Sequence, residues 1–102
     1  MAKVTAELLH RFEKMIETQF PDGKAMRCQM ARYQEQNLSE TLFLWDLWYS
    51  CPSVAITPLM KEAYAAGCVD TQITAALMQC VKSLYGLDYK NSETQPPGSG
   101  GV

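Results

Sequence analysis

Few residues of this chain combine a reactive side chain with the spacing that catalysis needs. His10 is the single histidine, and no known motif ties a serine, cysteine or carboxylate to it. Glu13 and Glu17 could act as paired acid–base carboxylates, but their spacing puts them on an exposed helix face. No glycine-rich phosphate loop is visible. We therefore expect a non-enzymatic protein with no catalytic residue and no cofactor.

The cysteines are the other reactive side chains. Their spacings match no C-x-x-C or zinc pattern, and His10 has no second ligand nearby, so we expect no metal site. We interpret them as reduced, small core residues of a cytoplasmic protein. Their even number leaves open two disulfides in a secreted protein. The four are Cys28, Cys51, Cys68 and Cys80.

One stretch, residues 59–78, has the spacing of a known motif, reading LMKEAYAAGCVDTQITAALM. Ala63 is small where two helices would cross, Gly67 falls at the turn, and Ile73 and Leu77 would pack the second helix inward. The stretch resembles a helix-turn-helix element, which places its second helix in the major groove of DNA. A purely structural corner between two helices fits the same residues.

The resemblance implies a set of DNA-binding residues. The second helix would turn threonine and glutamine side chains to base edges. Phosphate attraction would come mainly from residues 1–32, which carry six Lys and Arg against four Asp and Glu. That helix contains no arginine, and Asp70 precedes it, which weighs against DNA. The candidate residues are Arg27, Arg32, Thr71, Gln72, Thr74 and Lys82.

The most hydrophobic stretch, residues 38–51, reads LSETLFLWDLWYSC and holds both tryptophans. Leu42, Trp45 and Tyr49 follow one another on one helical face, while Leu44, Leu47 and Trp48 follow on a second. A helix that is apolar nearly all round is either buried or has a partner. We therefore weigh a central core helix against an aromatic surface for another protein. The residues expected at such a surface are Phe43, Trp45, Trp48 and Tyr49, flanked by Met26, Met30 and Met60.

Asp46 lies in the middle of that stretch. A lone carboxylate there must face water, pair with a cation or rise in pKa. We expect it to face solvent.

Hydrophobic periodicity predicts five helices and no strand. The helices are expected over 4–20, 24–36, the tryptophan-rich stretch, 59–66 and 71–85. Asp22, Asn37 or Ser39, Thr57 and Asp70 are the expected N-caps, and Gly67 and Gly86 the expected C-terminal glycines. Residues 51–56 are expected to form a connector.

Length and composition indicate one domain. The chain has 102 residues, 47% hydrophobic and 20% charged, with a net charge of -2. That balance argues against sequence-blind binding to nucleic acid or anionic lipid. No signal peptide is evident, and no apolar run reaches the roughly 20 residues of a membrane-spanning helix. From Lys90 onward the composition is rich in Pro, Gly and Ser, which predicts a disordered tail over 90–102 after a domain of 1–89.

These observations predict a compact all-α bundle of five short helices. The function we expect is a cytoplasmic protein-binding module acting as an inhibitor, adaptor or assembly factor. Its partner is expected to be another protein, with a homodimer as one form, and no membrane is involved. The alternative is a helix-turn-helix transcriptional regulator that binds DNA.

Overall fold

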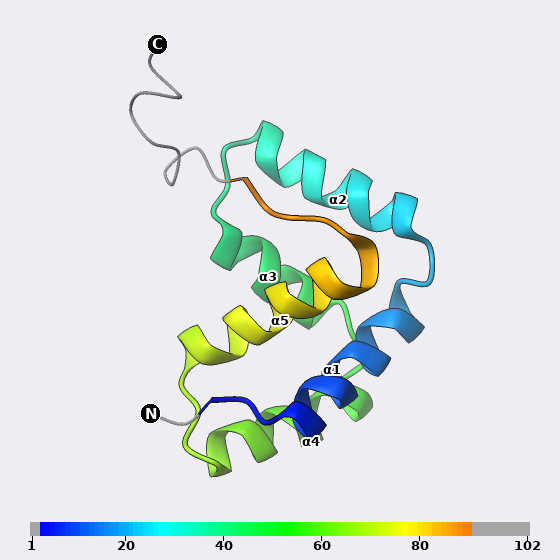
Figure 1. Ribbon diagram of the computed structural model, residues 1–102. Helices are drawn as coiled ribbons and strands as arrows, with labels where there is room; N and C mark the ends of the chain where they lie inside the picture. Colours follow the sequence, from blue (N-terminus) through cyan, green and yellow to red (C-terminus); the bar gives the residue numbers. More distant parts are fainter. Residues whose placement is uncertain (1–2, 91–102) are drawn as a thin grey trace.

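The structure is a computed structural model that describes residues 3–90, and within that range every regular element is a helix (Figure 1). The predicted all-α, five-helix fold class is therefore confirmed. Of the predicted tail, residues 91–102 lie outside the described residues. The helices are α1 (Ala6–Gln19), α2 (Gly23–Glu35), α3 (Glu40–Tyr49), α4 (Ser53–Ala65) and α5 (Asp70–Tyr85).

Three helices begin at a side-chain oxygen that accepts a backbone N–H of the first turn. Thr5 Oγ1 accepts from Leu8 N at 3.1 Å, Asp22 Oδ1 from Lys24 N at 2.9 Å, and Ser39 Oγ from Leu42 N at 3.1 Å. Such caps satisfy N–H groups that have no partner inside the helix. The prediction for Asp22 is confirmed, and of the two candidates for α3 it is Ser39 that caps.

Asn37 instead ends α2. Its φ is 57°, and the N–H groups of Asn37 and Leu38 donate to Gln34 O and Tyr33 O, both at 3.0 Å. This is the left-handed C-terminal motif that asparagine and glycine favour. Gly67, with φ 93°, ends α4 in the same way, as predicted.

The start of α4 differs from the prediction. The helix begins at Ser53 with Pro52 as its N-cap, so most of the expected connector is helical and Pro58 lies inside the helix. Ile56, Leu59 and Ala63 share one face and are buried at 6%, 4% and 0% exposure. Burying that face requires helix from Ile56 onward, and this packing outweighs the local preference for a new start at Thr57.

The start of α5 also differs. Val69 is the N-cap residue, and its backbone N–H donates to Gln72 Oε1 at 2.8 Å. Asp70, the predicted cap, is instead the first helical residue, and its Oδ1 accepts a hydrogen bond from the Tyr64 hydroxyl at 2.7 Å. Gly86 ends α5 with φ 67°, as predicted.

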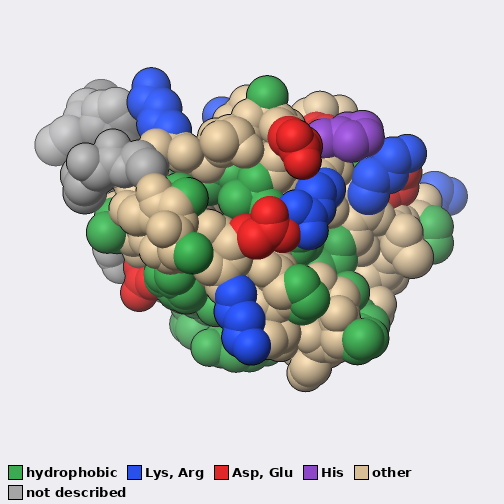
Figure 2. Space-filling model, turned by 90° about the horizontal axis from the view of Figure 1, so that it is seen from below, with side chains coloured by type: hydrophobic (Ala, Val, Ile, Leu, Met, Phe, Trp, Pro, Cys, Tyr) green, Lys and Arg blue, Asp and Glu red, His purple; other side chains and the backbone are tan. Residues whose placement is uncertain are grey.

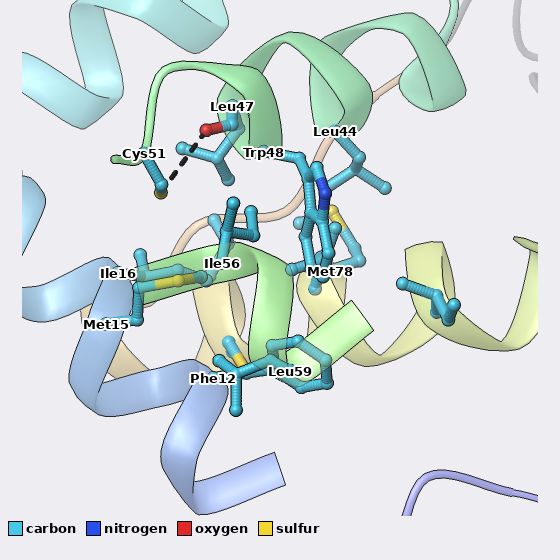
Figure 3. Close-up of a cluster of buried hydrophobic side chains, with 14 of the residues drawn as sticks. Phe12, Met15, Ile16, Leu44, Leu47, Trp48, Cys51, Ile56, Leu59 and Met78 are labelled. Atoms are coloured by element: carbon cyan, nitrogen blue, oxygen red, sulfur yellow. Dashed lines mark hydrogen bonds between the residues drawn. The ribbon is translucent and has the colours of Figure 1, made fainter. Parts of the chain in front are cut away.

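The core forms where α1 packs on α5 and α4, and α3 packs on α5 (Figure 1). Figure 3 shows the side chains that converge from α1, α3, α4 and α5. Phe12 and Trp48 are at its centre, with ring centroids 5.2 Å apart and almost no solvent exposure. After α5, residues 87–90 run back between α2 and α3. Among the described helices none has both the length and the apolar character needed to cross a bilayer.

Candidate functional site

The structure divides the four residues predicted to bind a partner. Phe43 and Trp48 are core residues, with 0% and 1% of their surface exposed. Phe43 lies between the rings of Tyr33 and Tyr89, at centroid distances of 5.5 and 5.2 Å. Trp48 points into the cluster of Figure 3. The prediction that these two side chains form a surface is therefore wrong, because α1 covers Trp48, and α2 and Tyr89 cover Phe43.

The expectation that three methionines flank a binding surface is also wrong. Met26 and Met30 are buried, with 0% and 3% exposure, and serve to dock α2. Met60 is partly buried, and its sulfur accepts a hydrogen bond from the Trp48 indole N–H. Methionine is here a packing residue rather than an adaptable surface.

Leu42, Trp45 and Tyr49 remain accessible and form what we call the aromatic strip. Tyr49 is 74% exposed and Leu42 40% exposed, while Trp45 is half-buried. The Trp45 and Tyr49 rings lie 6.2 Å apart at 32°, and Trp45 contacts Trp48 edge-to-face at 6.2 Å. The core tryptophan thus supports the strip from behind, and the strip lies on the face that helical spacing predicted.

Asp46 does not interrupt the strip, because it turns toward α2. The Tyr33 hydroxyl donates a hydrogen bond to Asp46 Oδ2. This bond, followed by burial and the negative charge of Asp46, raises the pKa of Tyr33. Asp46 is half-buried rather than solvent-facing as expected. Turning this carboxylate aside leaves no charged residue within the strip itself.

Tyr64 of α4 extends the accessible aromatic surface beyond α3. It is 45% exposed, and its pKa is raised to about 12 by its hydrogen bond to Asp70, by burial, by the Asp70 charge and, least, by nearby Tyr49. Beside it is an open hollow of about 420 Å³. The sequence pattern did not indicate Tyr64, which lies one helical turn before Gly67. The hollow is lined by Tyr64, Cys68, Val69, Asp70 and Thr71.

The helix-turn-helix stretch folds as a corner between α4 and α5. Ala63, Ile73 and Leu77 are fully buried, as their spacing predicted. Thr74 is also buried, and its hydroxyl donates to Asp70 O and Thr71 O, both at 3.1 Å. The expectation that Thr74 faces DNA is therefore wrong.

The other candidate DNA-binding residues are not gathered on one surface. Gln72 is engaged in the cap of α5, and Lys82 Nζ lies 3.5 Å from Asp88 Oδ1. Thr71 is exposed at the start of α5, whereas Arg27 and Arg32 are exposed on α2. On the face shown in Figure 2, acidic and basic side chains alternate instead of forming a basic tract. On that face the charged side chains therefore form no continuous basic tract of the kind that phosphate binding favours.

The histidine and the cysteines are the remaining reactive side chains. His10 Nδ1 is 3.8 Å from Glu13 Oε1 on the surface of α1. Across residues 3–90, no three His, Cys, Asp or Glu side chains lie close enough to hold a metal ion. The cysteines form no disulfide, and Cys28 is exposed rather than in the core, while the other three are buried.

Comparison of the chain with protein-family models, with curated proteins and with solved structures finds no match.

Proposed function

We propose that this chain is a non-catalytic protein-binding module that holds a partner protein against the aromatic strip. The observation that carries the proposal is Tyr49, which is 74% exposed beside Trp45 on a helix whose opposite face is core. An inhibitor, an adaptor and an assembly factor all work by such docking. The absence of disulfides supports a reducing compartment such as the cytoplasm.

The chemistry of the strip suits a protein partner. Tyrosine and tryptophan are enriched among the residues that dominate binding energy, because they bury a large rigid area and keep a polar tip. Trp45 is held by Trp48, so little side-chain entropy is lost on docking. We infer that the partner offers an apolar patch for Leu42, Trp45 and Tyr49, and that its rim covers Tyr64.

The first stage of the test identifies the partner. A photo-crosslinking amino acid is placed at Tyr49 and, as a matched control, at His10, which is exposed on α1. We expect a partner that is captured from position 49 and not from position 10. Equal capture from the two positions would contradict docking on the strip.

The second stage measures affinity for the purified partner by calorimetry. Tyr49→Ala is expected to weaken binding by about 2 kcal/mol, close to thirtyfold, because a buried aromatic anchor is lost. His10→Ala should bind as the unmodified chain does. Both variants should unfold at the same urea concentration as the unmodified chain, since neither side chain is in the core. An unchanged Kd for Tyr49→Ala would refute the proposal.

A further inference from the structure

Residues 87–90 form an extended segment, here called the strap, that runs between α2 and α3 (Figure 1). It contacts Gln34, Leu38 and Phe43, and the surface made by these three residues is here called the groove. Tyr89 is only 5% exposed, its ring stacks on Phe43 at 5.2 Å and 27°, and its hydroxyl donates to Leu38 O at 2.6 Å. Gln34 Nε2 donates to Lys90 O at 3.2 Å. The groove therefore holds both the side chain and the backbone of the strap.

The strap completes the packing of α2. The extensive helix pairs join α1 to α5, α1 to α4 and α3 to α5, and none of them includes α2. Tyr33 of α2 reaches the same Phe43 ring edge-on, at 5.5 Å and 72°. Phe43 thus has a tyrosine from α2 on one side and Tyr89 on the other. Without a strap in place, α2 would leave Phe43 partly uncovered.

Gly86 joins the strap to α5 and has the properties of a hinge. Its φ is 67°, a conformation that glycine adopts freely, and glycine adopts extended conformations equally well. A Cβ built at this position would meet no atom within 4 Å. Among residues 3–90, the ion pair near the hinge joins Lys82 to Asp88 at 3.5 Å, and it is exposed and therefore weak. Gly86 and this weak ion pair therefore place little restraint on the strap where it leaves α5.

We propose that the groove also binds the strap of a second copy of this chain, so that two copies exchange residues 87–90 about Gly86. The second copy is the occupant because its strap makes the same contacts that the structure shows for the chain's own strap. The exchanged dimer keeps the contacts of the monomer, so its free energy differs from that of two monomers only through the hinge conformation and the entropy of association. In the dimer each groove is completed by Tyr89 of the other copy, which packs on Phe43 rather than on a residue of the aromatic strip.

Gly86→Ala tests the hinge. An alanine is strained at φ 67° in the closed hinge but not in an extended one, which should shift the balance toward the open hinge about tenfold. Sedimentation from micromolar to millimolar concentration should then show dimer at lower concentration than the unmodified chain. Gly23→Ala is the control, because its Cβ would make only an ordinary 3.7 Å contact with Tyr85. If Gly86→Ala dimerises no more than Gly23→Ala, the proposal fails.

A cross-linking experiment identifies which surface joins the copies. Two full-length chains, each with Cys28→Ser and Gly86→Ala, carry either Gln34→Cys or Lys90→Cys and are mixed with a short bismaleimide. The exchanged dimer brings position 90 of one chain beside position 34 of the other, so a covalent heterodimer is expected. Lys14→Cys in place of Gln34→Cys is the control for random collision.

A heterodimer yield no greater than this control overturns strap exchange. Strap exchange is also overturned if Tyr49→Ala abolishes the dimer and Gly86→Ala leaves its formation unchanged, because the copies would then associate through the aromatic strip. That result would leave the proposed function of the strip intact.

Discussion

Asp46 is the single charged residue between Thr41 and Tyr49, and the structure accommodates it by one hydrogen bond from Tyr33. A half-buried carboxylate without a partner would lose hydration and gain nothing in return. The Tyr33 hydroxyl supplies that partner and also ties α2 to α3. One residue on a neighbouring helix therefore pairs with the carboxylate on the α2 side of α3, away from the aromatic strip.

Tyr33→Phe should lower the free energy of unfolding by about 1.5 kcal/mol, because it removes the hydrogen bond to a charged group and leaves Asp46 unpaired. The same substitution at Tyr49, which is 74% exposed, should change the free energy of unfolding by less than about 0.5 kcal/mol. Urea denaturation of both variants provides the measurement. Equal effects at the two positions would show that the Tyr33–Asp46 contact adds no stability.

At the scale of the helix, α4 shows how a local start signal is overridden. Thr57 followed by Pro58 is a favourable way to begin a helix, yet α4 begins four residues earlier at Ser53. The longer helix places Ile56 on the same buried face as Leu59 and Ala63, and this burial favours it. At Ser39, by contrast, the local preference and the packing agree, and its side chain caps α3.

Ser39→Ala and Thr57→Ala compare a residue that caps a helix with a residue that was only predicted to cap one. Loss of the Ser39 cap should cost about 1 kcal/mol of stability, since Leu42 N–H loses its acceptor. Thr57 is exposed inside a helix, where alanine is the better helix former, so its replacement should be neutral or slightly stabilising. Thermal unfolding compares the two. A loss on Thr57→Ala equal to that on Ser39→Ala would mean that α4 begins where the sequence suggested.

At the scale of the whole molecule, tyrosine hydroxyls link segments that are distant in the sequence. Tyr85 of α5 donates to Phe20 O at 2.6 Å and so holds the turn between α1 and α2. Tyr89 donates to Leu38 O across a separation of 51 residues. Burial first, and then the charge of Glu17, raises the pKa of Tyr85 to about 12. These two tertiary contacts therefore depend on neutral tyrosines.

Stability should accordingly fall in alkali. Above the ordinary tyrosine pKa of 10.0 the unfolded chain loses the Tyr85 proton, while the folded chain keeps it up to about 12. The stability that this proton confers is complete below pH 10 and is lost as the pH rises through about 12. Urea midpoints measured across that range should decline, and the decline should be shallower in Tyr85→Phe. A midpoint independent of pH, or a decline unaffected by the substitution, would contradict this account.

The sequence by itself determined the features that depend on neighbouring residues. Periodicity indicated five helices, and Asp22, Gly67 and Gly86 marked their ends correctly, because a cap is made with backbone groups only a few residues away. It also showed that Leu42, Trp45 and Tyr49 share one face of α3. These are the three residues of the aromatic strip, so the candidate site was partly visible in the sequence.

Only the tertiary structure decided which aromatic residues are covered. α3 is apolar on nearly every side, so its own pattern cannot distinguish Trp48, which is buried, from Tyr49, which is exposed. The difference arises because α1 brings Phe12 to Trp48, and the strap brings Tyr89 to Phe43. These contacts join residues tens of positions apart, and burial is a property of the assembled surfaces rather than of any one helix.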